Sequence, residues 1–234
     1  MGERATIPGG RGGAGIFEAA LLYSTFWLRA LLPLGGHGIG PADAIFHLSI
    51  LLNLVPAGGL ILWVMHRGEG FPAFSLDTKA RPGDAAGALG VLAVLLLVGL
   101  LPGSVAGLLY HGQLPSWLDN PLLAPSSGPR LPTPVFIPLV LAASLVTGHV
   151  EELYFRVYLS YRLKGAGLGK AARILLSSLI FGLSHANQGL PAAFLALILG
   201  AVLALRWEAK KSWHEIGLGH GLYDFIVFLI LLYA

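Results

Sequence analysis

The chain has 234 residues, of which 55% are hydrophobic and only 12% are charged, and its mean hydropathy is +0.74. A soluble domain carries about 25% charged residues, so this composition excludes an ordinary soluble protein and indicates an integral membrane protein. The absence of cysteine excludes disulfides, thiolate catalysis and cysteine-ligated metals. The net charge of +3 does not indicate a nucleic-acid partner, because the basic residues lie in short loops, as in a polytopic membrane protein.

Along the chain, residues 1–15 are rich in glycine and predict a flexible leader, and residues 16–234 predict a single helical membrane domain. Glycine, proline or charged residues bound seven apolar segments. The predicted fold class is an all-α polytopic membrane protein with about seven transmembrane helices, or eight, and an active site inside the bundle. The fifth and sixth segments are shorter than the roughly 20 residues of a full span. The seven segments are 16–34, 44–65, 85–110, 133–162, 172–189, 191–206 and 213–233.

The loop charges predict the orientation of the chain. If the N-terminus is cytoplasmic and all seven segments span, the inside loops hold 12 of the 15 Lys and Arg residues. Only Arg130 then lies in an outside loop. The positive-inside rule therefore predicts a cytoplasmic N-terminus and an outside C-terminus, and we expect a prokaryotic plasma membrane protein.

Three charged residues interrupt the apolar segment 133–162, namely Glu151, Glu152 and Arg156. A charged group near the bilayer centre costs from about 3 to more than 10 kcal/mol, so each must face protein or trapped water. Glu152 and Arg156 are four residues apart, with the glutamate first, which favours an ion pair. Glu151 points about 100° away and has no partner on its own helix. We therefore predict that Glu152 and Arg156 support the site and that Glu151 acts as a general base.

Three further proton-active residues lie in apolar segments, namely His185, His220 and Asp224. His220 and Asp224 are four residues apart and share one helix face. Counted from the nearest basic loop, Glu151, His185 and His220 are each roughly 14–18 Å deep at about 1.5 Å per helical residue. The sequence therefore predicts that three helices bring proton-active side chains to one level of the membrane.

These motifs resemble the CPBP (Abi) family, which includes the type II CAAX prenyl endopeptidases and bacteriocin-processing or immunity proteins. The residues that carry the resemblance follow one another on successive helices over about residues 133–233: Glu151-Glu152 with Arg156, Phe181 with His185, and His220 with Asp224. The resemblance implies an intramembrane endopeptidase. In such an enzyme Glu151 activates water with help from His185, and the motif of His220 and Asp224 supports the oxyanion.

The last position departs from the eukaryotic prenyl proteases, which have Asn where this chain has Asp224. An ionised Asp cannot donate a hydrogen bond to an oxyanion, so Asp224 must be protonated, orient His220 or bind a cation. We therefore expect protease chemistry on a protein or peptide substrate with a membrane-associated terminus, prenylated or not. Two alternatives remain, a proton-coupled transporter and a non-catalytic immunity or scaffold protein. Paired carboxylates and histidines also form proton relays, although no internal repeat supports a transporter.

The four residues predicted to be catalytic are also acceptable ligands for a divalent ion such as zinc. If the charges of Glu152 and Arg156 cancel, the carboxylates of Glu151 and Asp224 leave two negative charges for a cation to balance. The spacing is nevertheless not a His-Glu-x-x-His signature, and protonation of Asp224 and one histidine would balance the same charges. We predict no cofactor, with a metal site as the alternative. Its ligands would be Glu151, His185, His220 and Asp224.

Overall fold

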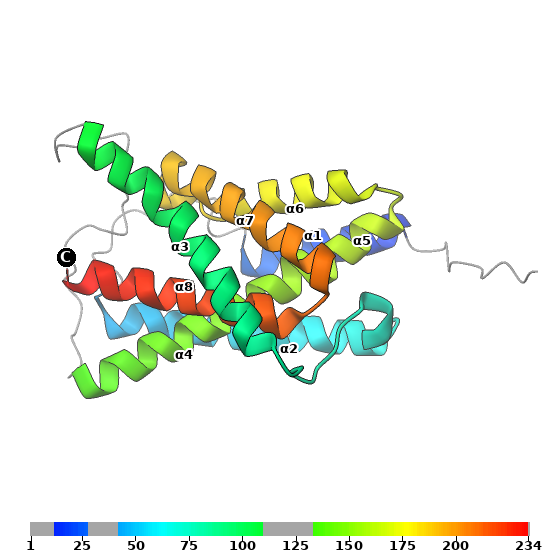
Figure 1. Cartoon of the computed structure of the whole chain (residues 1–234). Coiled ribbons are helices and arrows are strands. Elements are labelled where there is room, and N and C mark those ends of the chain that lie inside the picture. Colours follow the sequence, from blue (N-terminus) through cyan, green and yellow to red (C-terminus); the bar gives the residue numbers. More distant parts are fainter. Residues whose placement is uncertain (1–11, 28–41, 110–132, 234) are drawn as a thin grey trace, which may run out of the picture.

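The computed structural model describes residues 12–27, 42–109 and 133–233, and within these ranges every regular element is helical (Figure 1). The predicted all-α fold class is therefore confirmed for this part of the chain. Two elements are short 3₁₀ turns, η2 and η6, and one, η5, is a π-helical segment. In chain order the elements are α1 (Gly12–Phe26), α2 (Ala44–Arg67), η2 (Phe71–Phe74), α3 (Asp84–Leu109), α4 (Thr133–Glu152), η5 (Leu153–Leu159), α5 (Ser160–Gly165), α6 (Lys170–Leu183), η6 (Ala186–Gln188), α7 (Leu190–Lys210) and α8 (Trp213–Tyr233).

Within the described ranges, four helical stretches are long and apolar enough to cross a membrane. They are Ala44–Arg67, Thr133–Gly165, Leu190–Lys210 and Trp213–Leu232. The predicted number of seven or eight spans stays a prediction.

Two predicted boundaries differ from the structure. Helix α1 begins at Gly12, inside the segment 1–15 that the sequence predicts as a leader, and residues 1–11 lie outside the described ranges. Helix α7 has 21 residues, so the predicted segment 191–206 is shorter than the helix, and the prediction that it falls short of a full span is wrong. Pro191 in its first turn is compatible with helix, and the helix continues through charged residues to Lys210. Helix α6, with 14 residues, is short as predicted.

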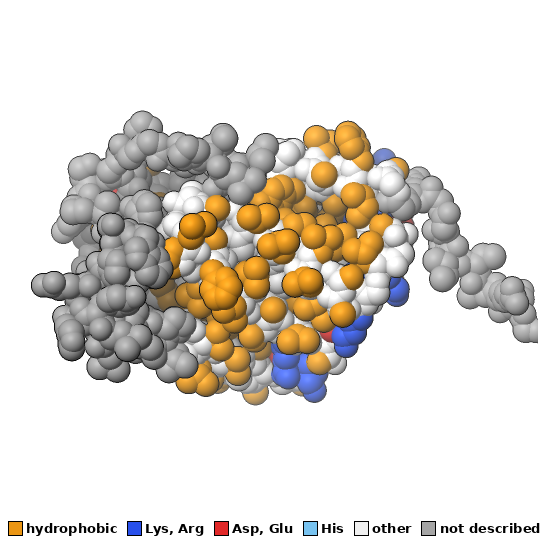
Figure 2. Space-filling model, turned by 90° about the horizontal axis from the view of Figure 1, so that it is seen from above, with side chains coloured by type: hydrophobic (Ala, Val, Ile, Leu, Met, Phe, Trp, Pro, Cys, Tyr) orange, Lys and Arg blue, Asp and Glu red, His pale blue; other side chains and the backbone are white. Residues whose placement is uncertain are grey.

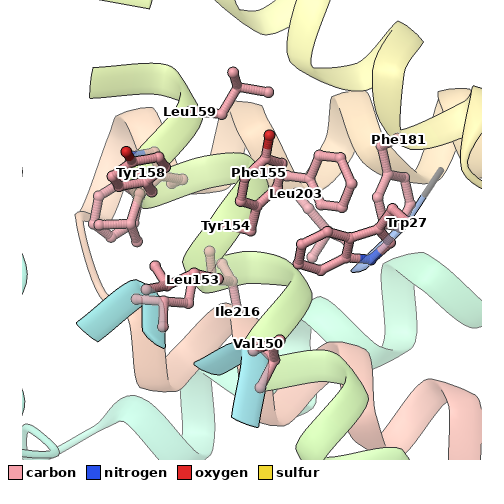
Figure 3. Packing of buried hydrophobic residues seen from close by; sticks show 14 of the residues in the cluster. Trp27, Val150, Leu153, Tyr154, Phe155, Tyr158, Leu159, Phe181, Leu203 and Ile216 are labelled. Carbon is pink, nitrogen blue, oxygen red and sulfur yellow. The ribbon is translucent and has the colours of Figure 1, made fainter. Parts of the chain in front are cut away.

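The helix formed by α4, η5 and α5 lies at the centre of the molecule. All seven residues of η5 are buried, and η5 contacts α1, α2, α6, α7 and α8. Because protein surrounds η5 on every side, no side of Leu153–Leu159 needs to be polar, and the segment shows no amphipathic pattern. Figure 3 shows the side chains of this segment packed among Trp27, Phe181 and Leu203. The π-helical turn directly follows Glu152, and such turns often occur at functional sites.

Glycines bring α4 and α8 into close contact, and Figure 1 shows these two helices side by side. A Cβ atom added to Gly148 of α4 would lie 2.5 Å from the carbonyl oxygen of Gly217 on α8. A Cβ atom added to Gly221 would lie 2.8 Å from the Cα atom of Leu145. Gly217 and Gly221 form a Gly-x-x-x-Gly pair, which lets membrane helices approach backbone to backbone. His220 lies within this contact, so the glycines determine its distance from the end of α4.

Helix α1 is attached to the central helix by polar contacts on one face. The hydroxyl of Tyr154 donates a hydrogen bond to the carbonyl oxygen of Ala19 over 2.8 Å. Two turns further on, Arg162 is bound by Glu18 at 2.8 Å and by Glu69 at 2.5 Å. The hydroxyl of Tyr158 also donates to Glu18. Glu18 therefore has a structural role, because it binds both Arg162 and Tyr158 of the central helix.

We expect Arg162→Met to destabilise the protein by about 1–3 kcal/mol, because two carboxylates lose their common partner. We place the loss below that of a fully buried pair, because Glu18 is 36% exposed and Glu69 is 25% exposed. Thermal unfolding in detergent measures the change. Lys164→Met, on the exposed end of the same helix, is the matched control and should leave the melting temperature unchanged. Equal melting temperatures for the two variants would contradict this role of Arg162.

The surface of the described part is largely apolar. Figure 2 shows one face on which hydrophobic side chains predominate, with Lys and Arg gathered toward one end. Large hydrophobic side chains on α2, α3 and α7 are more than half exposed, among them Leu52, Leu97 and Leu205. An exposed apolar surface of this extent fits contact with lipid.

Candidate active site

Glu152, the last residue of α4, has two partners inside the protein. Its Oε2 atom lies 3.1 Å from Nε of Arg156, and both side chains are fully buried. Its Oε1 atom lies 3.0 Å from Nδ1 of His220 on α8. Because a carboxylate accepts, Nδ1 of His220 donates this bond. The structure therefore contains the ion pair expected from the spacing, and in addition Glu152 orients His220.

The other nitrogen of His220 faces two more carboxylates. Its Nε2 atom lies 4.0 Å from Oε2 of Glu151 and 3.6 Å from Oδ1 of Asp224. His220 and Glu151 are buried, whereas Asp224 is 20% exposed. His220 is thus surrounded by three carboxylates, two from α4 and one from its own helix. The structure brings Glu151, His220 and Asp224 together within one small region between α4 and α8.

His185 lies at the edge of this region, in the turn after α6. Its Nδ1 atom is 2.9 Å from the carbonyl oxygen of Phe181. A carbonyl oxygen only accepts, so Nδ1 carries the proton and Nε2 of the neutral ring offers a lone pair. In the described part of the chain no hydrogen bond or ion pair joins His185 to the three carboxylates, although Asp224 and His220 lie close enough to influence it electrostatically.

Phe181 separates the two histidines and also contacts Arg156. Its ring centroid lies 4.7 Å from that of His185 and 5.8 Å from that of His220. The guanidinium carbon of Arg156 lies 4.6 Å from the same ring centroid, within range of a cation–π interaction. Arg156 therefore supports the site through two contacts, the ion pair with Glu152 and the cation–π contact with Phe181.

His149 of α4 contacts the first turns of α8. Its Nδ1 atom donates to the carbonyl oxygen of Leu145 over 2.9 Å, and its own carbonyl oxygen accepts from Nε1 of Trp213 over 2.8 Å. Its ring packs on Gly217. These contacts join α4 to the start of α8, so His149 supports the interface between the two helices.

Sequence reasoning missed two features of the packing around the site. The first is the glycine contact, although Gly148 and the pair Gly217 and Gly221 are visible as small residues in apolar segments. The second is Trp27, which follows α1 and is 5% exposed. Its ring stacks on Tyr154 with a centroid distance of 4.6 Å. No pattern in the sequence connects Trp27 to the motifs, because it lies more than 120 residues from Glu151.

A metal site requires several donor side chains close to one point. In the ranges that the structure describes, no three His, Asp or Glu side chains lie close enough together to hold one metal ion. Nδ1 of His185 and Nδ1 of His220 are hydrogen-bonded within the protein, which leaves Nε2 as the nitrogen that each ring would offer to a ligand. No step below is assigned to a metal.

The arrangement combines the carboxylates of Glu151, Glu152 and Asp224 with the imidazole of His220 between apolar helices, with His185 nearby. Residues 133–226 match the family model described as type II CAAX prenyl endopeptidase Rce1-like. The match confirms the resemblance that the motifs predict and supports a CAAX-type intramembrane endopeptidase. No curated protein and no solved structure matches the chain.

Proposed function

We propose that this protein is an intramembrane endopeptidase in which Glu151 activates a water molecule to hydrolyse a peptide bond. The observation that carries the proposal is the position of His220 between Glu151, Glu152 and Asp224, at distances of 3.0–4.0 Å. A general base and a hydrogen-bond donor within one small region are what peptide hydrolysis requires. The match of residues 133–226 supports the same reaction.

In the proposed reaction the oxygen of water attacks the carbonyl carbon of the scissile bond while its proton moves to Glu151. The carbonyl oxygen becomes an oxyanion. A protonated His220 donates to Glu152 through Nδ1 and to the oxyanion through Nε2. The intermediate then collapses, the C–N bond breaks, and the proton held by Glu151 passes to the leaving amine. The products are a carboxylate and an amine, and Glu151 is regenerated.

Asp224 and His185 have different roles in this proposal. Asp224 takes the place of the Asn of the eukaryotic prenyl proteases, and at 3.6 Å from Nε2 its carboxylate attracts the protonated ring electrostatically and leaves the Nε2–H group for the oxyanion. His185 presents an unprotonated Nε2 atom, which accepts a hydrogen bond from the attacking water. Both assignments retain Glu152 and Arg156 as the pair that supports the site.

We propose a protein or peptide substrate whose cleaved terminus is held at the membrane, with the N-terminus of the enzyme on the cytoplasmic side. Comparative proteomics of membranes tests the function in the cell. Strains that lack the gene and carry either the intact chain or the Glu151→Gln variant should differ in the mass of at least one membrane-associated protein, which only the intact chain shortens. Identical membrane proteomes in the two strains would contradict the proposal.

We further propose that cleavage is independent of metal, since the carboxylates and imidazoles supply a base and a donor without one. Exhaustive chelation should leave the rate of the purified enzyme within about twofold of the untreated rate. Elemental analysis of the same sample should find no stoichiometric metal. Loss of activity that stoichiometric zinc restores, together with about one bound ion per chain, would make this prediction wrong. Glu151, His185, His220 and Asp224 would then be the candidate ligands.

A further inference from the structure

We infer that Gly200 of α7 is a positioning residue of the active site, because the absence of a side chain there leaves the room that Arg156 and Phe181 occupy. The inference rests on the proposed function, in which His220 stabilises the oxyanion. Gly200 belongs to none of the three motifs, and it acts on the reaction only through the side chains that it contacts.

The space at position 200 is already filled by its neighbours. Gly200 is buried where α7 packs on α6 and on η5. A Cβ atom added there would lie 2.9 Å from Cδ1 of Phe181, 3.3 Å from Nη2 of Arg156 and 3.5 Å from the Cα atom of Ser178. Two carbon atoms prefer a separation of roughly 3.5–4.0 Å. Phe181 is 2% exposed and Arg156 is fully buried, so a methyl group at position 200 must displace one of these side chains or α7 itself.

Few contacts hold the guanidinium of Arg156 in place. Its Nε atom lies 3.1 Å from Oε2 of Glu152, and its central carbon lies 4.6 Å from the centroid of the Phe181 ring. In the described part of the chain, its Nη1 and Nη2 atoms have no hydrogen-bond partner. Packing therefore determines where these two terminal nitrogens lie, and Gly200 is part of that packing.

A displaced guanidinium would change the orientation of His220. The carboxylate of Glu152 contacts Arg156 through Oε2 and accepts from Nδ1 of His220 through Oε1 over 3.0 Å. Phe181 makes a second connection, because its ring centroid lies 5.8 Å from that of His220. Two routes therefore join Gly200 to the proposed oxyanion donor, although none of the three atoms nearest the added Cβ atom belongs to His220.

The ¹⁵N resonances of the His220 ring test this connection without any substrate. The chain has eight histidines, and the imidazole resonances that are absent from His220→Gln belong to His220. Gly200→Ala should shift the Nδ1 resonance, because the hydrogen bond to Glu152 changes. Gly59→Ala on α2 is the matched control, since a Cβ atom there meets nothing within 4 Å, and it should leave the resonance in place. An Nδ1 resonance that stays in place in Gly200→Ala would overturn the inference.

Kinetics test the consequence for the reaction. Gly200→Ala should lower kcat by about 10- to 100-fold, since a displacement of about 1 Å can cost about 10²-fold in rate, and KM should stay within about twofold. Gly59→Ala should retain kcat. Wild-type kcat in Gly200→Ala would overturn the inference. If the intact chain cleaves nothing, the proposed function fails, and the NMR spectra still decide whether Gly200 positions His220.

A double variant decides the matter if Gly200→Ala alone does not fold. Arg156→Lys retains the charge beside Glu152 and removes the guanidinium, which leaves room for the added methyl group and the Phe181 ring. Gly200→Ala combined with Arg156→Lys should therefore fold as Arg156→Lys alone does. A double variant that fails to fold, when Arg156→Lys folds, would show that the methyl group acts elsewhere and would overturn the inference.

Discussion

Replacing Glu151 by glutamine is expected to lower kcat by at least about 10³-fold and to leave the protein folded. An amide cannot take the proton of water, and general-base catalysis contributes about 10²–10⁴-fold. The melting temperature should stay the same or rise, because the substitution removes one of three carboxylates around His220 and relieves repulsion with Glu152 and Asp224. Initial cleavage rates and thermal unfolding of the same preparation measure the two effects.

Glu152→Gln is the control for this prediction, since it makes the same change one residue further on. It leaves the buried guanidinium of Arg156 without its charged partner and should cost about 3–5 kcal/mol of stability. Glu151→Gln should therefore be inactive but stable, whereas Glu152→Gln should be unstable. Retained activity in Glu151→Gln would contradict the role of Glu151 as the base, and equal stability of the two variants would contradict the division between base and support.

Gly148→Ala is expected to lower both stability and activity, although Gly148 contacts no substrate. The added methyl group would lie 2.5 Å from the Gly217 carbonyl oxygen and 2.8 Å from the Gly221 Cα atom. These are backbone atoms, so α4 and α8 must separate, and we expect a loss of about 3 kcal/mol, at the upper end for overpacking. His220 would move away from Glu151, and a displacement of about 1 Å can cost 10²-fold in rate.

Gly90→Ala on α3 is the matched control, because a Cβ atom there meets nothing within 4 Å. It should be neutral or slightly stabilising, since alanine is the better helix former. The melting temperatures and kcat values of the two alanine variants make the comparison. If Gly148→Ala behaves like Gly90→Ala, the glycine contact does not set the geometry of the site.

Local patterns predicted those parts of the fold and site that depend on the sequence around each residue. The apolar segments gave the positions of α2, α3 and α8 to within a few residues. The spacing of Glu152 and Arg156 predicted their ion pair. The free-energy cost of charge in hydrocarbon predicted that Glu151 and His220 face protein at one level of the membrane, and in the structure the two side chains are 4.0 Å apart. Each of these follows from helical periodicity or from the free energy of burying charge.

Features that depend on packing between distant segments were beyond the same reasoning. The π-helical turn at Leu153–Leu159 arises where the helix is surrounded on all sides, and a regular α-helix was expected there. The bond from His220 to Glu152 depends on how closely α4 and α8 approach. Trp27 stacks on Tyr154 only because α1 packs along the central helix, which no spacing within residues 133–233 encodes.

Cleavage in ¹⁸O-labelled water, with hydroxylamine present in a parallel sample, tests most directly whether Glu151 activates water. The purified enzyme in liposomes would be given a peptide with a lipid-anchored terminus, and the products would be analysed by mass spectrometry. If water attacks the peptide bond, each new carboxylate carries one ¹⁸O atom, hydroxylamine traps nothing, and Glu151→Gln yields no product. A hydroxamate whose formation requires Glu151 would instead show that the carboxylate attacks the substrate itself and would contradict the mechanism.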